Sequence, residues 1–284
     1  GPRGPRRGAL MQQSTRSRLT LRVIALGYLA LLLAVPLGMI FYRTFERGLG
    51  AFVDQITTPA CISAINLSLT IVAIVVPINV VLGVITALAL ARGTFPGKGV
   101  LHAVVDLPFA VSPVVVGVSL TLLWGVHGWF GGLAGHGIHV IFSLPGMVIA
   151  TIFVTLPFVV REVEPVLMEI GQEQEQAAAT LGASRGQIFR RITLPAIRWG
   201  LAYGVVLTVA RSLGEFGALI VVAGGVAGKS QTLTLLVHAR YLDDRNTYGA
   251  YCAATVLMGL ALVALLLMVL VNRQRSAQSE EVAA

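Results

Sequence analysis

The segment EQAAATLGASRGQIFRRITLP, residues 175–195, decides how the rest of this sequence is interpreted. It lies within residues 162–198, the longest strongly charged stretch, in which five glutamates precede four arginines. Gly182 can end one short helix, because glycine adopts a left-handed backbone without steric cost. Ser184 and Gln187 then have the spacing of a capping box, which begins a second helix. The pattern therefore predicts two short helices joined by a turn.

The two predicted helices suit contact with another protein. Ala177 and Ala178 make the first helix thin enough for its backbone to enter a cleft on a partner. Ile188 and Ile192 share one face of the second, because residues four apart are neighbours on a helix. We expect Pro195 to end the second helix, since proline disrupts a helix interior. A solvated loop without a partner is the alternative that the charges alone leave open.

The composition places these helices beside a membrane. The 284 residues are 56% hydrophobic and 12% charged, with a mean hydropathy of +0.82. That charged fraction is about half the average for soluble proteins. Such a chain cannot bury its apolar surface in a soluble fold, so we expect an all-α integral membrane protein. The net charge of +8 does not indicate nucleic acid, because the basic residues fall at the ends of apolar runs.

Six membrane spans fit between the charged residues. The interval from Asp106 to Arg161 has no formal charge and is too long for one helix, so glycines at 128–137 are expected to divide it. Each interval can supply the roughly 20 residues that a crossing needs. The intervals are 22–43, 54–92, the two parts of 106–161, a fifth from Arg198 to before about Gly228, and a sixth from Arg245 to Arg273.

The positive charges orient the spans. Of the 21 arginines and lysines, 15 lie on the side that would hold both termini and residues 162–198, and five lie on the other side. Positively charged loops stay in the cytoplasm, so both termini are predicted to be cytoplasmic. We expect a disordered basic tail at residues 1–20, a membrane domain at 21–272 and a cytoplasmic tail at 273–284.

The fifth predicted span contains two charges, in the segment RSLGEFG at residues 211–217. Arg211 and Glu215 are four residues apart, so they can meet on one helix face. Pairing reduces the cost of several kcal/mol for each charge at membrane depth. The pair either ties the span to a neighbouring helix or belongs to a polar route across the membrane. Thr208 and Ser212 could add hydroxyl groups to this route or bond only to their own helix.

The third predicted span contains DLPFAVSPVVVG, residues 106–117. Pro108 and Pro113 interrupt backbone hydrogen bonds, which is tolerated where neighbours or water replace those bonds. We expect Asp106 to lie near the cytoplasmic interface. Three hydroxyls could face an anion or bond only to their own helices, and these are Ser112, Ser119 and Thr121.

Other chemistry has little support in the sequence. Cys61 and Cys252 lack metal-ligand spacing, and the five histidines form no ligand cluster. The segment GGVAGKS at 224–230 has the wrong glycine spacing for a nucleotide-binding loop. We therefore expect no catalytic residues, no bound metal and no cofactor on this chain.

The central segment resembles the cytoplasmic loop of ABC importer permeases. The matching pattern is Glu/Gln-Ala-Ala, three residues, Gly, nine residues and Ile-x-Leu-Pro. In that family the loop docks into a groove on an ATP-hydrolysing subunit. Gln176 replaces the usual glutamate, and Glu175 directly precedes it. The resemblance assigns the docking role to Glu175, Gln176, Ala177, Ala178, Gly182, Ile192, Leu194 and Pro195.

Further segments are similar to permeases of bacterial sulfate/thiosulfate importers over about residues 21–272. They are residues 106–117, LPFVVREVEPVL at 156–167, ARSLGEFGA at 210–218 and QTLTLLV at 231–237. The resemblance implies the type I permease fold with coupling helices between spans four and five. It implies two permease subunits, either two copies of one chain or this chain with a related sister chain. It also implies partner ATPases that carry ATP and Mg.

The same resemblance implies an extracytoplasmic sulfate-binding protein and a bacterial plasma membrane location. On this interpretation Arg211, Ser212, Glu215, Ser112 and Thr208 lie along the translocation pathway. A stretch like residues 211–217 also occurs in molybdate permeases, so it does not name the anion. The alternatives are a permease for molybdate or another oxyanion, an ion channel, and a membrane-bound enzyme.

Overall fold

The computed structural model describes residues 15–132 and 139–283, and every regular element within those ranges is a helix. Five helical segments are long and apolar enough to cross a membrane. A sixth crossing is obtained only when two bent helices count as one. The five segments are Arg22–Phe45 within α1 (Thr15–Phe45), α3 (Pro59–Arg92), α6 (Leu144–Ile170), Arg185–Leu213, and Thr247–Leu267 within α12 (Thr247–Ala283). The all-α membrane fold is thus confirmed.

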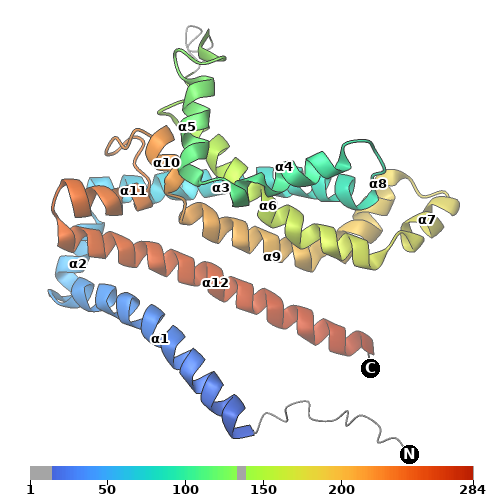
Figure 1. Cartoon of the computed structure of the whole chain (residues 1–284), viewed down its shortest axis with the longest axis horizontal. Coiled ribbons are helices and arrows are strands. Elements are labelled where there is room, and N and C mark those ends of the chain that lie inside the picture. Colours follow the sequence, from blue (N-terminus) through green and yellow to red (C-terminus); the bar gives the residue numbers. More distant parts are fainter. Residues whose placement is uncertain (1–14, 133–138, 284) are drawn as a thin grey trace, which may run out of the picture.

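The third predicted span is broken rather than continuous. It consists of α4 (Lys98–Ala110) and α5 (Pro113–Trp124), whose axes differ by 112°. Val111 and Ser112 between them have extended ψ angles of 134°. Pro113 explains the break, because a residue before proline is pushed out of the helical region. As Figure 1 shows, α5 points away from the direction of the long helices.

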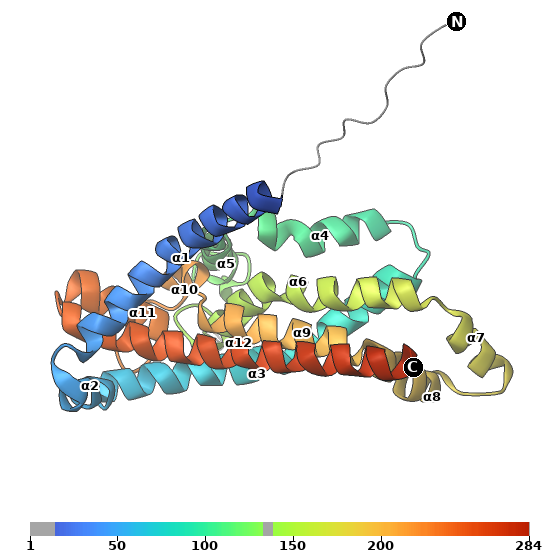
Figure 2. The ribbon, with the colours of Figure 1, turned by 90° about the horizontal axis from the view of Figure 1, so that it is seen from below.

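The short helices lie at opposite ends of the bundle. At one end are α7 (Glu173–Thr180) and α8 (Arg185–Ile188), and α12 ends toward this side (Figures 1 and 2). At the other end are α2 (Gly48–Ile56), α11 (Leu233–His238) and the π-helical turn η3 (Ala239–Asp243). The helix that carries the C-terminal residues therefore runs toward the predicted docking helices.

The core is centred on α6, which packs more extensively against α3 and α9 (Leu194–Leu213) than any other pair of helices does. Glycines allow the close approach. A Cβ atom on Gly83 of α3 would lie 2.6 Å from the Val159 side chain of α6. A Cβ atom on Gly200 of α9 would lie 2.6 Å from the backbone oxygen of Glu162. Small residues let membrane helices approach each other and gain van der Waals contact.

The fifth span begins earlier than predicted. Residues Arg185–Leu213 form one 29-residue helical segment that includes α8, the π-helical turn η2 (Phe189–Thr193) and α9. The expectation that Pro195 ends the second docking helix is therefore wrong. The Leu194 N–H donates to the Phe189 carbonyl, five residues earlier. This wider turn comes directly before Pro195 and lets the helix continue, since proline at the start of a helical stretch needs no N–H partner.

The predicted tails are partly helical. Residues 15–20 belong to α1, and residues 273–283 continue α12, because neither segment contains a helix-breaking proline or glycine. Residues 1–14 of the predicted basic tail lie outside the described residues. The predicted glycine turn separates α5 from α6 as expected, although its residues 133–138 also lie outside the described part.

The glycine contacts between α6 and α9 predict a sharp difference between two substitutions. Gly200→Ala would force a backbone carbonyl to move, and overpacking of this kind costs about 1–3 kcal/mol. Gly259→Ala in α12 is the matched control, since a Cβ atom added there would have no atom within 4 Å. Thermal unfolding in detergent should show a lower midpoint for Gly200→Ala alone. Equal midpoints for the two variants would contradict this packing.

Candidate functional site

The helix–turn–helix has the predicted structure, and we call residues 173–193 the docking hairpin. Gly182 has a φ angle of +86° and follows α7. The N–H groups of Gly182 and Ala183 donate to the carbonyls of Ala179 and Ala178, which satisfies the end of the helix. Ser184 and Gln187 form the predicted capping box at the start of α8.

Glu175 anchors the docking hairpin to the bundle. Its Oε2 lies 3.2 Å from Nε of Arg92 at the end of α3. Its Oε1 accepts a 2.8 Å hydrogen bond from the Thr193 hydroxyl. Arg92 also donates to the carbonyl of Leu167 near the end of α6 at 2.8 Å. Glu175 is therefore an internal brace, whereas the neighbouring Gln176 is exposed.

Only some of the residues predicted to dock on a partner are exposed. Gln176, Ala177, Gly182 and Pro195 are exposed, whereas Ala178, Ile192 and Leu194 are partly buried against the chain. Leu181, at the turn, has 88% of its surface exposed. It was not predicted as a site residue, although an isolated leucine in a charged stretch was a usable signal. An exposed apolar side chain at a projecting tip suits insertion into a partner.

A small pocket forms where two helices are interrupted, and we call it the break pocket. One interruption separates α4 from α5, and the other separates α9 from α10 (Gly217–Val222). The two meet, since a Cβ atom on Gly217 would lie 3.0 Å from Pro113. The pocket has a volume of about 300 Å³ and is lined by Pro108, Phe109, Ala110, Val111, Ser112, Pro113, Val154, Phe158 and Arg211.

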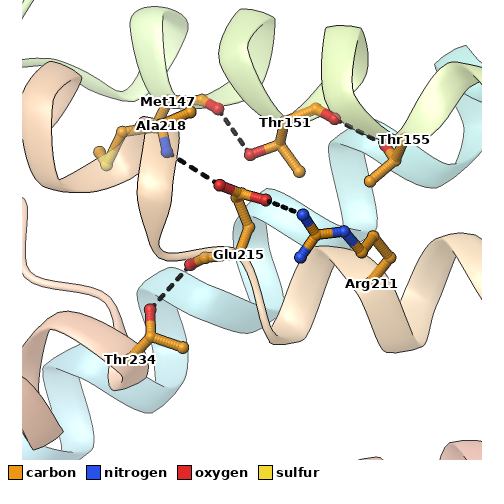
Figure 3. Close-up of polar contacts among 7 residues, drawn as sticks. All are labelled: Met147, Thr151, Thr155, Arg211, Glu215, Ala218 and Thr234. Carbon is orange, nitrogen blue, oxygen red and sulfur yellow. Dashed lines mark hydrogen bonds and ion pairs between the residues drawn. The ribbon is translucent and has the colours of Figure 1, made fainter. Parts of the chain in front are cut away.

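Arg211 and Glu215 form the predicted ion pair, but not on a continuous helix. Nη2 of Arg211 lies 3.2 Å from Oε2 of Glu215, and α9 ends between them at Leu213 (Figure 3). The other carboxylate oxygen of Glu215 accepts a 2.9 Å hydrogen bond from the N–H of Ala218 in α10. The Thr234 hydroxyl donates to the Glu215 carbonyl at 2.8 Å. The pair thus fixes the break between α9 and α10.

The five predicted hydroxyls lie in three different environments. Ser112 lines the break pocket together with Arg211. Ser212 is buried, and its Oγ has no hydrogen-bond partner among the described residues. The remaining three donate to carbonyls of their own helices, Thr208 to Gly204, Ser119 to Val115 and Thr121 to Gly117. Thr208 is also buried and is not among the residues that line the pocket.

Contacts that the sequence did not predict hold α4 against α6. Asp106 accepts a 2.8 Å hydrogen bond from Arg161, whose guanidinium also lies over the Phe109 ring. Arg161 lies within α6, which continues to Ile170, so the helix extends beyond the charge that bounded the predicted interval. His102 Nε2 lies 2.9 Å from Oε1 of the buried Glu164. These polar contacts fix the first half of the broken span.

Residues 79–276 match the family described as binding-protein-dependent transport system inner membrane component. The chain belongs to this family. It is therefore a multi-pass membrane protein of the ABC importer permease type, and the matched residues contain both the docking hairpin and the break pocket.

Individual relatives agree with this assignment. The sulfate transport system permease CysW of Synechocystis sp. is 51% identical over 245 residues, which are 86% of this chain and 88% of the relative. The sulfate transport system permease CysT of Salmonella typhimurium is 37% identical and covers 85% of this chain and 87% of its own length. A solved bacterial ABC transporter for the acidic polysaccharide alginate shares the fold, with a TM-score of 0.73 at 19% identity over 91% of this chain and 95% of that one.

The contacts of Glu175 predict that removal of its charge makes the docking hairpin easier to open. Glu175→Gln removes the ion pair with the partly buried Arg92, which should lower the free energy of opening the docking hairpin by about 1–3 kcal/mol. Glu173→Gln is the control, since it removes an equal charge from the same first helical turn at an exposed position. Hydrogen exchange should quicken in the hairpin of the first variant only. Equal exchange in both variants would rule out the brace.

Proposed function

We propose that this chain is a membrane-spanning subunit of an ABC importer that takes up sulfate or thiosulfate. Its similarity to sulfate permeases at 51% and 37% identity supports the substrate class. The observation that carries the proposal is the break pocket, where Arg211 and Ser112 face the same space between interrupted helices. Discontinuous membrane helices with exposed N-termini are a recurring way to hold an anion at membrane depth.

The break pocket offers an oxyanion two donor side chains and the end of a helix. Arg211 supplies a guanidinium with several N–H donors, and Ser112 supplies a hydroxyl. Pro113, the first residue of α5, also lines the pocket, so the N-terminal end of that helix lies beside it, although proline itself has no N–H to donate. Anions are favoured at this end of a helix by the aligned peptide dipoles. Such donors replace part of the water that the anion loses.

The docking hairpin is assigned to the ATPase partner. It projects at one end of the bundle (Figure 2), and its exposed Leu181 and Ala177 present a small apolar surface. ATP and Mg belong to that partner in this proposal, and this chain contributes no catalytic group. The family description supports an external binding protein, which we propose delivers the anion. A sister permease of the CysT type is the proposed second membrane subunit.

The connection from hairpin to pocket explains how the motion of a partner could move the anion site. The 29-residue helical segment from Arg185 to Leu213 links the docking hairpin directly to Arg211. Through Glu175 and Arg92, the same hairpin is tied to the end of α3, a few residues before α4. Both walls of the break pocket are thus connected to the hairpin. We propose that closing of the ATPase pair uses these connections to alternate access.

The proposed orientation follows from the charges. The end that carries the docking hairpin is assigned to the cytoplasm, together with both termini, because most arginines and lysines lie on that side. The opposite end, with α2 and α11, then faces the binding protein. The membrane is assigned as the bacterial plasma membrane. The apolar stretch within Arg22–Phe45 is not buried by the rest of the described chain, which suits contact with lipid or with the second permease.

Transport in the reconstituted complex tests the substrate and the pocket together. Sulfate or thiosulfate should stimulate ATP hydrolysis and enter vesicles, with weaker competition from molybdate. Arg211→Gln should reduce uptake about tenfold to a hundredfold, since hydrogen bonds to charged groups are worth about 1.5–3 kcal/mol. Ser119→Ala is the control, because that hydroxyl is bonded within its own helix. Stimulation by molybdate alone would overturn the substrate, and full uptake by Arg211→Gln would overturn the pocket.

Docking through the hairpin tip has its own test. Leu181→Asp should abolish copurification of the ATPase while the membrane helices stay folded, because this side chain is 88% exposed and supports no core. Val226→Asp adds the same charge at an exposed apolar position beyond α10, toward the other end of the bundle. It should leave copurification unchanged. Retention of the ATPase by Leu181→Asp would show that docking occurs elsewhere.

A further inference from the structure

The two side chains of the ion pair beside the break pocket differ in how deeply they are buried. The Glu215 side chain is fully buried, with 0% of its surface exposed, whereas 37% of the Arg211 side chain is exposed. Arg211 lines the pocket, and Glu215 does not. Arg211 therefore borders the pocket while its guanidinium contacts the buried carboxylate, a contact that Figure 3 shows. An oxyanion in the pocket would meet a cation that already has an internal counter-ion.

Glu215 cannot follow Arg211 into the pocket. Its Oε1 is held by the N–H of Ala218, and its own carbonyl is held by the Thr234 hydroxyl. Its Oε2 has no hydrogen-bond partner among the described residues. The 3.2 Å contact of Oε2 with Arg211 has the distance of an ion pair but not the angles of a hydrogen bond. The carboxylate is thus fixed by the backbone, while the guanidinium keeps donors for another acceptor.

We propose that Glu215 is a built-in competitor of the transported oxyanion, which sets a low affinity at Arg211. This inference rests on the proposed function and adds a role for the acid. A carboxylate and an oxyanion present the same kind of charged oxygen acceptor to a guanidinium. Because Glu215 balances the charge of Arg211, the ion pair has no net positive charge. An anion that binds in the pocket is therefore held weakly and can leave again. Conduction across a membrane requires sites that bind weakly enough for release.

The burial of Glu215 also makes the competition for Arg211 favour release of the anion. When Arg211 turns toward an anion, Oε2 of Glu215 loses its charged neighbour in a buried position. An uncompensated buried charge is unfavourable, so the guanidinium is drawn back as the anion leaves. The half-exposed pair of Asp106 and Arg161 lacks this property, because water can solvate both partners. The acid at position 215 therefore favours release of the anion.

Equilibrium binding of sulfate, thiosulfate and molybdate to the complete purified transporter tests this role. Glu215→Gln keeps an oxygen acceptor for the N–H of Ala218 and removes the charge. It should raise the affinity for the transported anion about tenfold or more, by the Coulomb energy of a nearby charge, and slow its uptake. Glu46→Gln is the control, because it removes an acid from an exposed ion pair with Arg43 and should change neither value. Arg211→Gln and the double variant Arg211→Gln/Glu215→Gln should lose binding.

Each outcome decides the matter. An unchanged affinity in an assembled Glu215→Gln transporter, with normal transport by the wild type, overturns the competitor role alone. If Glu215→Gln fails to assemble while the double variant assembles, the acid serves to neutralise Arg211 structurally, which also overturns it. If the wild type binds and transports none of the three anions, the proposed function fails and this inference fails with it.

Discussion

The need to satisfy backbone polar groups inside a bilayer governs this molecule. A helix that stops at membrane depth leaves N–H and C=O groups without partners, which lipid cannot supply. Here two helices stop near each other, one at Val111 and the other at Gly214. Glu215 satisfies one N–H of α10, and the opposed glycine and proline at 217 and 113 bring the two breaks together. The result is a pocket between the two breaks that Arg211 and Ser112 line together with apolar residues, and that pocket is the basis of the proposed transport role.

Long-range coupling follows from the continuity of the fifth span. The π-helical turn before Pro195 keeps the segment from Arg185 to Leu213 helical. One continuous helical segment therefore connects the docking hairpin to the pocket. The brace between Glu175 and Arg92 adds a second connection through α3. Close glycine contacts at Gly83 and Gly200 make α3, α6 and α9 a compact core. In the proposed mechanism, these connections transmit movement of the hairpin to both sides of the break.

Local signals in the sequence predicted local structure well. The turn at Gly182 and the cap at Ser184 depend on nearby residues only, and both are confirmed. The pair of Arg211 and Glu215 was predicted from its spacing, although the helix end between them was not. Contacts such as Glu175 with Arg92 join residues that are far apart in the chain, and no local pattern reveals them. The 112° bend at residues 111–112 was beyond prediction as well, because prolines within membrane helices often cause only a kink.

If an oxyanion crosses the membrane through the space between the two helix breaks, it should be found there in the working complex. A structure of the complete transporter with bound selenate, located by the anomalous scattering of selenium, gives the sharpest test. We expect a selenium peak in the break pocket, with oxygen atoms in hydrogen-bond distance of Arg211 and Ser112. Selenate bound on a route that avoids Arg211, or a break pocket filled by side chains of the second permease, would contradict this route.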